Sequence, residues 1–579
     1  MPIATRVIAV LATVFLTAGP TLGQYTWTGA SGNVWSDLGS AGANWSVGGS
    51  PAFWAPPFDL NKQAIFPASG ANQSVVLGSP IELSDIQFTG GAYTINLNGR
   101  TLTLNGSAGA GLRSIAVSSG ITATLAGAGG VTTTGGNLVK TGAGTLLLGF
   151  NSGTFLTTST GVIEIRSGAI QTAGSASALN TTTSVILGSG VASGELVLGS
   201  GTNADAQTLV GLTTAGTGTA NRVYTGSSVG TSNLTLTIAG GTTNTFGGVL
   251  GGSTGNQASL NTVFGQSGAG VATIVLNGAN LYTGTTLVNS NTRLRIGNAT
   301  ALGADAGGGV SVSNGATLEL NGQTVGAKAV TITGAGATGA GAALLNNSGT
   351  AASLAGTVTL AGGSGNAVGG SGNLTLSGPV TGSGRLDKVG TGVLILSNSG
   401  NNYGGGTTIA GGGTVRMGAD NALSNQGLGL NGGTLSSGAA AGFSGSFGPL
   451  SQTATSTLAL GTGDHTLTFT TLSYTGGTLT VNGWTGLMNG TGTSGKLVFT
   501  GLAGDPNTTF ASFLSNVTFT GADTSGNTFL AGGAFIPSGV NYELVPAPEP
   551  ATCLAVSAAG LGLAGFVRRR LAGRPRPVA

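Results

Sequence analysis

The residues of this sequence that could take part in catalysis are few and far apart. The single histidine, His465, follows Asp464 directly, and no serine can be assigned to it, so we expect a turn position rather than a Ser-His-Asp triad. Some β-helices cleave acidic polysaccharides with Asp, Lys and Arg side chains that cluster on one face. The acids are instead scattered along the chain, at Asp85, Glu164, Glu195, Glu319 and Asp387. We therefore expect that the protein is not an enzyme.

Residue patterns for metals and cofactors are missing as well. The Gly-Gly-Gly runs at Gly307 and Gly411 lack the aspartates that ligate calcium in glycine-rich repeats. No glycine-rich loop is followed by Lys-Ser or Lys-Thr, the arrangement that holds a phosphate. The only cysteine, Cys553, lies in an apolar segment near the C-terminus, so the preceding chain forms no disulfide and no thiolate metal site. We expect no metal and no cofactor.

The C-terminal apolar segment has the features of a membrane anchor. Residues 551–567 carry no charge, and as a helix they would rise about 25 Å, close to the minimum for crossing a bilayer. Arg568, Arg569 and Arg570 follow at once, and such cationic flanks stay on the cytoplasmic side. We predict a single transmembrane helix with the preceding chain outside; a buried core helix with a solvated tail is the alternative.

The N-terminus predicts export. Residues 1–23 contain a basic Arg6, an apolar stretch over 7–16 and small residues before the end, the pattern of a secretory signal peptide. We predict cleavage between Gly23 and Gln24 after transfer through the Sec translocon. An uncleaved anchor is the alternative, although the apolar stretch is short for one.

The last 34 residues resemble a known sorting signal. The sequence PAPEP at 546–550, the apolar segment and the arginine cluster occur in the order of the PEP-CTERM signal of bacteria that make exopolysaccharide. In that family a membrane-embedded cysteine protease, an exosortase, recognises the tripeptide. The resemblance therefore implies that Pro548, Glu549 and Pro550 form the recognition element of 546–579 and that an exosortase is a partner. The two prolines would hold the glutamate in an extended backbone that cannot join a helix.

The charge of the exported part excludes a nucleic-acid partner. The whole chain has 19 basic and 16 acidic residues, but Arg6 and the five arginines of the tail belong to the targeting segments. Without these six, 13 basic residues face 16 acidic ones, a net charge of −3. No electrostatic footprint for phosphates remains.

Short alternating stretches predict β-strands throughout the chain. Examples begin at Ala92 (AYTINLNGRTLTLNG), Ala316 (ATLELNG) and His465 (HTLTFTTLSYTGGTLTVNG). Apolar residues alternate with Thr or Asn and are followed by Asn-Gly or Gly-Gly, which is typical of half-buried strands joined by tight turns. Glycine accounts for 112 of the 579 residues and fits such corners.

A longer repeat overlies the strands. Three copies align on Lys140, Gln266 and Lys388, which are 126 and 122 residues apart. A second landmark, the leucine of an Ala-Leu pair, has nearly the same period; it occurs at Leu179, Leu302 and Leu423. The copies, near 135–180, 263–303 and 384–424, resemble the autotransporter-associated β-strand repeat. The third copy matches well, the second lacks the lysine and the first lacks the Tyr-Thr-Gly step. This resemblance implies an architecture and says nothing of activity.

These strands are too short to bury an apolar face unless coils stack on one another. We predict an all-β chain whose residues 89–479 form a right-handed parallel β-helix (a solenoid) with coils of roughly 20–25 residues; a string of β-sandwiches is the alternative. Residues 24–88 and 480–545 are expected to cap its ends. The first cap holds four tryptophans, for which a carbohydrate site is an alternative to simple capping; they are Trp27, Trp35, Trp45 and Trp54.

Together these features predict a non-enzymatic, exported protein. It would be anchored in the inner membrane as a precursor and mature at the cell surface or in the extracellular matrix, with a structural or adhesive role in the exopolysaccharide layer and extracellular polysaccharide as a further partner. An autotransporter-like passenger or adhesin is one alternative, although that class carries a C-terminal barrel of amphipathic strands of about 10 residues, and a single apolar segment stands there instead. A polysaccharide-acting enzyme is the other.

Overall fold

We describe the chain from a computed structural model. It describes residues 23–35, 43–52, 54, 62–106, 113–150, 156–158, 161–173, 178–362, 365–488, 490–526, 528–529 and 532–547. The chain divides into two compact units, Met1–Ser232 and Asn233–Ala579, and each is described by itself.

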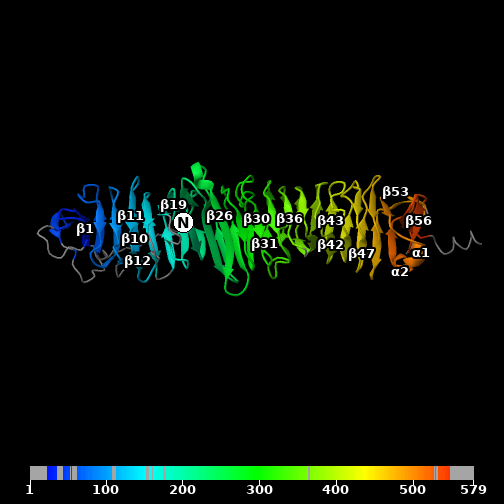
Figure 1. Cartoon of the computed structure of the whole chain (residues 1–579), viewed down its shortest axis with the longest axis horizontal. Helices are drawn as coiled ribbons and strands as arrows, with labels where there is room; N and C mark the ends of the chain where they lie inside the picture. Colours follow the sequence, from blue (N-terminus) through cyan, green and yellow to red (C-terminus); the bar gives the residue numbers. More distant parts are fainter. Residues whose placement is uncertain are drawn as a thin grey trace, which may run out of the picture. The chain divides into compact units, whose positions relative to one another are not determined.

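The first unit consists of short strands that stack into three sheets (Figure 1). The first sheet contains β1 (Gly23–Trp27), β2 (Trp45–Val47), β3 (Ser50–Ala52), β4 (Lys62–Phe66), β7 (Asp85–Phe88), β10 (Arg113–Val117), β13 (Leu138–Thr141), β16 (Val162–Ile165), β18 (Ser184–Leu187) and β21 (Gly211–Thr214). The second contains β5 (Ser74–Val76), β8 (Thr94–Asn96), β11 (Thr122–Ala126), β14 (Thr145–Gly149), β17 (Gly168–Thr172), β19 (Gly194–Gly201) and β22 (Arg222–Ser227). The third contains β6 (Ile81–Leu83), β9 (Arg100–Leu104), β12 (Gly129–Thr133) and β15 (Leu156–Thr157), and β20 (Ala206–Leu209) completes the unit.

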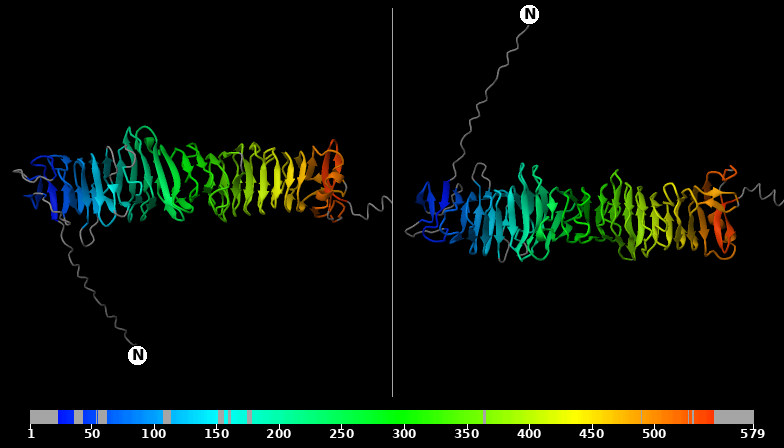
Figure 2. Two further views of the ribbon diagram at one scale, coloured as in Figure 1. Left: turned by 60° about the horizontal axis from the view of Figure 1, so that its bottom comes forward. Right: turned by 90° about the horizontal axis from the view of Figure 1, so that it is seen from above.

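The second unit repeats this plan, and its strands lie side by side in sequence order in both views of Figure 2. One sheet contains β23 (Ser232–Ala239), which starts at the boundary, β26 (Leu260–Ser267), β28 (Thr286–Val288), β30 (Val310–Val312), β33 (Val330–Ile332), β36 (Val358–Leu360) and β39 (Val380–Gly382). The longest contains β24 (Thr243–Phe246), β27 (Ala272–Leu276), β29 (Thr292–Ile296), β31 (Thr317–Glu319), β34 (Leu344–Leu345), β37 (Gly365–Gly369), β40 (Arg385–Val389), β42 (Thr407–Ala410), β44 (Leu428–Asn431), β47 (Leu450–Gln452) and β50 (Leu472–Tyr474). A third contains β32 (Thr324–Val325), β35 (Ala352–Leu354), β38 (Leu374–Leu376), β41 (Val393–Leu396), β43 (Thr414–Met417), β45 (Thr434–Ser436), β48 (Ser456–Ala459), β51 (Leu479–Asn482) and β55 (Val517–Thr520).

The remaining elements of the second unit are short. The five-stranded sheet contains β46 (Gly445–Phe447), β49 (Thr466–Phe469), β54 (Lys496–Phe499), β57 (Asn541–Pro546) and β56 (Gly533–Ser538). A two-stranded hairpin contains β52 (Thr485–Gly486) and β53 (Gly492–Ser494), and β25 (Val249–Leu250), the 3-10 turn η1 (Gly255–Ala258), α1 (Pro506–Thr509) and α2 (Ala511–Leu514) complete the set. Asp505 caps α1 by accepting a hydrogen bond from the backbone N–H of Asn507.

The strands pair in parallel, coil upon coil, and so confirm the prediction of an all-β parallel solenoid. In the second unit one inward column contains, in order, Leu294, Leu318, Leu344, Val368, Lys388, Ile409 and Leu430. Every one of these side chains is at most 1% exposed. Burying one aliphatic side chain contributes about 1.5–3 kcal/mol, so the columns supply the stability that no isolated strand pair could have. The parallel pairing excludes a string of antiparallel β-sandwiches.

Coil length varies more than the sequence predicts. One coil of the second unit runs 20 residues, from Val310 to the paired Val330, and the next runs 28, from Val330 to Val358. The difference lies in the turns, because the strands themselves keep the period-2 register. In the first unit the parallel ladder already includes Lys62–Phe66 and Asp85–Phe88, inside the predicted N-terminal cap.

Each sequence repeat corresponds to two stacked coils. In the third copy β40 pairs with β42 and β41 with β43; in the second copy β26 pairs with β28 and β27 with β29. The glycines of the Lys-x-Gly-x-Gly landmark lie against the coil below. A Cβ on Gly142 would meet the carbonyl oxygen of Val117 at 2.2 Å, and one on Gly144 would meet that of Ser118 at the same distance. Gly142 also has a φ of 73°, which favours glycine.

Antiparallel strands occur at the N-terminal end of the first unit and at the C-terminal end of the second unit. In the first unit β1 pairs in parallel with β4 but antiparallel with β2, and β3 continues that antiparallel pairing. In the second unit β57 pairs antiparallel with both β54 and β56. A change of direction ends the template for further parallel coils, and Pro51 in β3 further limits edge pairing.

Among the described residues, no helix is long and apolar enough to cross a membrane. The predicted transmembrane segment 551–567 and the predicted signal peptide up to residue 22 lie outside these residues.

Candidate functional site

The last described strand leads directly into the predicted sorting signal. In β57, Pro546 pairs with Gly533 of β56, and the backbone N–H of Ala547 donates to the carbonyl of Gly532 at 3.1 Å. Pro548, Glu549 and Pro550 follow immediately in the sequence and lie outside the described residues, as do Arg568, Arg569 and Arg570. The tripeptide that a sorting protease would recognise therefore begins directly after Ala547, the last residue that the structure describes.

A buried carboxylate fixes β57 to the cap. Glu543 is 1% exposed, and its Oε1 accepts a hydrogen bond from the backbone N–H of Gly492 in β53 at 2.6 Å. Burial raises the pKa of Glu543, against the opposing effects of the Gly492 N–H and of Lys496. The strand before the signal is thus held by a hydrogen bond to a different hairpin as well as by its own sheet.

At the other end, the predicted cleavage position lies in β1. Gly23 and Gln24 are the first two residues of the ladder, paired with Lys62 and Gln63 of β4. Cleavage between them would leave Gln24, whose Nε2 donates to Oε1 of Gln63 at 3.3 Å, as the first paired residue.

The four tryptophans of the N-terminal cap form an internal cluster. Their exposed fractions are 4% or less, and Trp45 lies within about 5 Å, centroid to centroid, of Trp27, Trp35 and Trp54. The indole N–H of Trp45 donates to the carbonyl of Trp35. The rings pack edge-on or tilted against one another and are almost fully buried, so they offer no exposed face for stacking on a sugar, and capping is the better interpretation of the cluster.

The lysines of the repeat landmark point into the solenoid. Lys140 and Lys388 are 0% exposed. Nζ of Lys140 donates to the carbonyls of Thr141 and Gly142 at 2.8 Å, and Nζ of Lys388 makes the corresponding bonds to the next two residues of its own turn. Burial lowers the pKa of both lysines to about 8. An amine that points inward at this position stabilises the turn through these hydrogen bonds. Because the side chain is fully buried, it has no contact with a substrate outside the solenoid.

The second copy shows the same register without the lysine. In the alternation of β26, Gln266 falls on the same side of the strand as the buried residues Leu260, Thr262 and Phe264. Its Oε1 is buried and has no hydrogen-bond partner among the described residues. The shorter side chain therefore does not reproduce the bonds to the turn that the lysines make in the first and third copies.

The scattered acids each have a local partner. Glu164 pairs with Arg166 at 2.7 Å, Glu195 with Arg222 at 3.0 Å and Asp387 with Arg385 at 2.6 Å. Asp85 instead accepts hydrogen bonds from the hydroxyl and the backbone N–H of Ser114. No group of three or more metal-ligating side chains occurs in the part of the chain that the structure describes.

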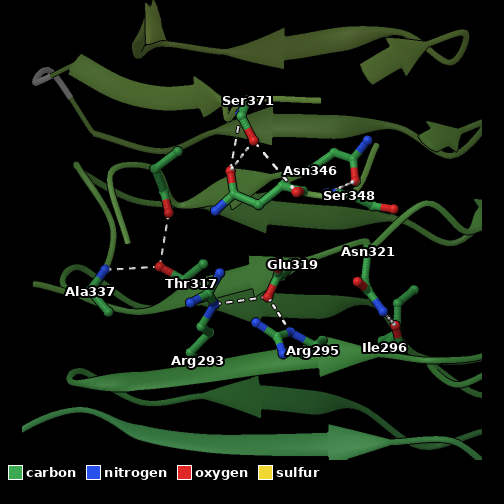
Figure 3. Close-up of polar contacts among 12 residues, drawn as sticks. Arg293, Arg295, Ile296, Thr317, Glu319, Asn321, Ala337, Asn346, Ser348 and Ser371 are labelled. Atoms are coloured by element: carbon green, nitrogen blue, oxygen red, sulfur yellow. Dashed lines mark hydrogen bonds and ion pairs between the residues drawn. The ribbon is translucent and has the colours of Figure 1, made fainter. Parts of the chain in front are cut away.

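Glu319 is the most buried of these carboxylates, at 2% exposed (Figure 3). Its Oε2 lies 2.8 Å from Nε of Arg293 and 2.6 Å from Nε of Arg295, both on the preceding strand β29. Next to it the hydroxyl of Thr317 donates to the carbonyl of Ala342 and accepts from the N–H of Ala337, so the turn before β34 packs over this face. The cluster clamps three successive chain segments together and leaves no free carboxylate for proton transfer.

The structure brings Ser437 to the single histidine, a contact that the sequence did not predict. Oγ of Ser437 lies 2.9 Å from Nε2 of His465, and Nδ1 lies 2.9 Å from the carbonyl oxygen of Gly463. A carbonyl only accepts, so Nδ1 carries a proton, and in the neutral ring Nε2 accepts from the serine hydroxyl. Ser437 is 0% and His465 3% exposed, and the serine oxygen also accepts from the N–H of Gly461. In connectivity the pair corresponds to two of the three members of a hydrolase triad. It is buried, however, and among the described residues the carbonyl of Gly463 stands in the place of the carboxylate. The two residues are 28 positions apart, and only the turn lengths determine that they meet.

Comparison with known families supports the reading of the C-terminus. Residues 546–570 match the model of the PEP-CTERM protein-sorting motif. This signal directs export through an exosortase-type system, which makes the chain a secreted, membrane-anchored precursor sorted to the cell surface. No curated protein matches the chain. No family model confirms the autotransporter-associated repeat, which remains a resemblance.

Proposed function

We propose that the protein is a non-enzymatic β-solenoid of the cell surface or extracellular matrix, with a structural or adhesive role in the exopolysaccharide layer. The observation that carries this proposal is the sorting motif, which begins at Pro546, the last residue of the antiparallel strand β57. A folded solenoid whose last strand ends at the signal is suited to delivery as a finished unit.

The chemistry of the described side chains supports the non-enzymatic part. Each acid named above is paired with arginine or hydroxyl groups, and the Ser437–His465 pair is buried. The pairs of Glu195 and Glu319 join neighbouring coils, whereas those of Glu164 and Asp387 lie within one coil. Carboxylates engaged in this way are not placed to act on an external substrate.

Fractionation of cells that produce the full-length chain tests the sorting. We expect the mature protein in the surface or extracellular fraction, with a new C-terminus located by mass spectrometry between residue 546 and the arginine cluster. As a matched control, replacing Glu549 with Ala should leave the chain in the membrane fraction with Arg570 still attached. Recovery of the intact chain from the cytoplasm alone would contradict the proposal.

Incubation with acidic and neutral glycans tests the non-enzymatic part. We expect no chain cleavage by the purified protein. Cleavage that is lost in the variant Ser437→Ala or in a variant of a paired acid would overturn it.

A further inference from the structure

A surface hollow lies at the third repeat copy and the turns that follow it, and the second copy has other side chains at two of the corresponding positions. It has a volume of about 440 Å³ and lies in the second unit; its lining residues are Ser399, Asn401, Asn402, Asn421, Leu423, Asn425 and Ser446. Its volume falls within the range of about 300–1,000 Å³ that is usual for small-molecule sites. All but one of these side chains are uncharged amides or hydroxyls.

The side chains of two lining residues, Asn401 and Asn421, make hydrogen bonds that shape the hollow. The Oδ1 of Asn401 accepts from the N–H of Val380, and its Nδ2 donates to the carbonyl of Ala422. Asn421, with a φ of 52°, accepts from the N–H of Ser446 at 3.2 Å. Leu423, which is 2% exposed, supplies an apolar floor.

Other lining groups are available. The side-chain amide of Asn402 and the hydroxyls of Ser399 and Ser446 make no hydrogen bond to any other residue that the structure describes, and all three residues are exposed. Asn425 is exposed as well, and its Oδ1 accepts only from Nε2 of the neighbouring Gln426. Amides and hydroxyls both donate and accept, so they match pairs of neighbouring ligand hydroxyls.

The second copy provides an internal comparison. There Asn280 makes the same bonds as Asn401, to the N–H of Leu250 and to the carbonyl of Ala301. Counting from these anchors, Leu281 occupies the place of Asn402, and Ala304 that of Asn425. The same scaffold therefore folds without the two amides, which means that the fold does not require them.

We propose that this hollow, lined by amides and hydroxyls, binds an uncharged oligosaccharide. An anionic sugar would find no basic side chain among the lining residues, and the exposed carboxylate of Asp420 adjoins them. A calcium ion prefers carboxylate ligands, and the lining contains none. The inference deepens the proposed function. It rests on that function only for the place, the cell surface, at which the protein meets the oligosaccharide.

Saturation-transfer NMR with the purified full-length chain tests the proposal. The detergent must be zwitterionic and free of sugar, and the probes are neutral trisaccharides of glucose, galactose and mannose, a uronic-acid trisaccharide and calcium chloride. We expect transfer to at least one neutral trisaccharide. The variant Asn402→Leu/Asn425→Ala, which copies the second repeat, should weaken binding at least ten-fold with an unchanged circular dichroism spectrum.

The matched control is Asn431→Ala, which removes an exposed asparagine at the end of β44 outside the hollow and should bind as the wild type does. Three outcomes would overturn the proposal: no neutral trisaccharide binds, only the uronic-acid probe or calcium binds, or the double variant binds as well as the wild type. Each of these leaves the fractionation result untouched, so failure here is distinguishable from failure of the sorting.

Discussion

The inward lysines predict an unusual dependence of stability on pH. Burial lowers the pKa of Lys140 and Lys388 to about 8, from 10.5 in the unfolded chain. Between these values the unfolded chain still binds protons that the folded chain has released. The free energy of unfolding therefore increases as pH rises through this window. Below the folded-state pKa both states carry the proton, and the cost of burying the charged amine is present in full.

The magnitude follows from the size of the shift. A decrease of the pKa from 10.5 to about 8 corresponds to about 3 kcal/mol per lysine, and most of this, about 2–3 kcal/mol, is recovered between about pH 7 and pH 10. The series of pH values must end near pH 10, because burial raises the pKa of Tyr224 and Tyr282 to about 12. Above about pH 10 the unfolded chain loses tyrosine protons first, and stability falls again.

The perturbation is Lys388→Met, which places an unbranched apolar side chain in the column between Val368 and Ile409. At neutral pH the loss of two charge-assisted hydrogen bonds and the relief of a buried charge largely offset each other, so little change is expected. The assay is urea denaturation followed by circular dichroism at a series of pH values. The variant should lose about 2–3 kcal/mol of the alkaline rise, and the double variant with Lys140→Met about twice that.

The control is Lys496→Met, which removes a lysine from the surface, where it lies 3.7 Å from Asp464. It should keep the wild-type rise. An equal rise in wild type and in Lys388→Met, or a flat profile in the wild type, would refute the reasoning that a desolvated amine limits stability at neutral pH.

Further substitutions test the other contacts. Ser437→Ala should lower the free energy of unfolding by about 1–3 kcal/mol in urea titrations, because it leaves a buried N–H and a histidine nitrogen unpaired; an unchanged value would contradict the buried pair. Glu319→Gln should cost about 1–3 kcal/mol, less than a fully buried ion pair because both arginines are partly exposed, and a rise in melting temperature would argue against the clamp. Glu543→Gln retains an acceptor for Gly492 and removes a buried charge, so it should be neutral or stabilising at neutral pH, whereas Glu543→Ala should destabilise by about 1–3 kcal/mol; equal losses in the two would show that charge matters more than the hydrogen bond.

The alternation of apolar and polar residues predicted much of the fold. In β40 the sequence Arg-Leu-Asp-Lys-Val places Leu386 and Lys388 on one face, and both are buried. The same alternation could have predicted that Lys388 points inward. A charged side chain is normally expected at the surface, however, because removing it from water is costly. Hydrogen bonds from the amine to its own turn are what make the position tolerable, and they become visible only in three dimensions.

The contacts between coils could not be predicted in the same way. Ser437 meets His465 across 28 residues, while other coils close in 20. Many serines and threonines lie within that range of the histidine, so the sequence leaves the partner undetermined. The hollow of the third copy depends on turns around Asn402, Asn421 and Ser446, and their approach is likewise a result of stacking.

The sequence by itself determined the strands, the glycine corners, the repeat and the C-terminal signal, because each depends on local geometry or on a contiguous stretch of residues. Only the tertiary structure decided which side chains are neighbours along the stack. The physical reason is that register within a strand is fixed by the two-residue pleat, whereas register between coils depends on turns of variable length and on the packing of each coil against the one before it.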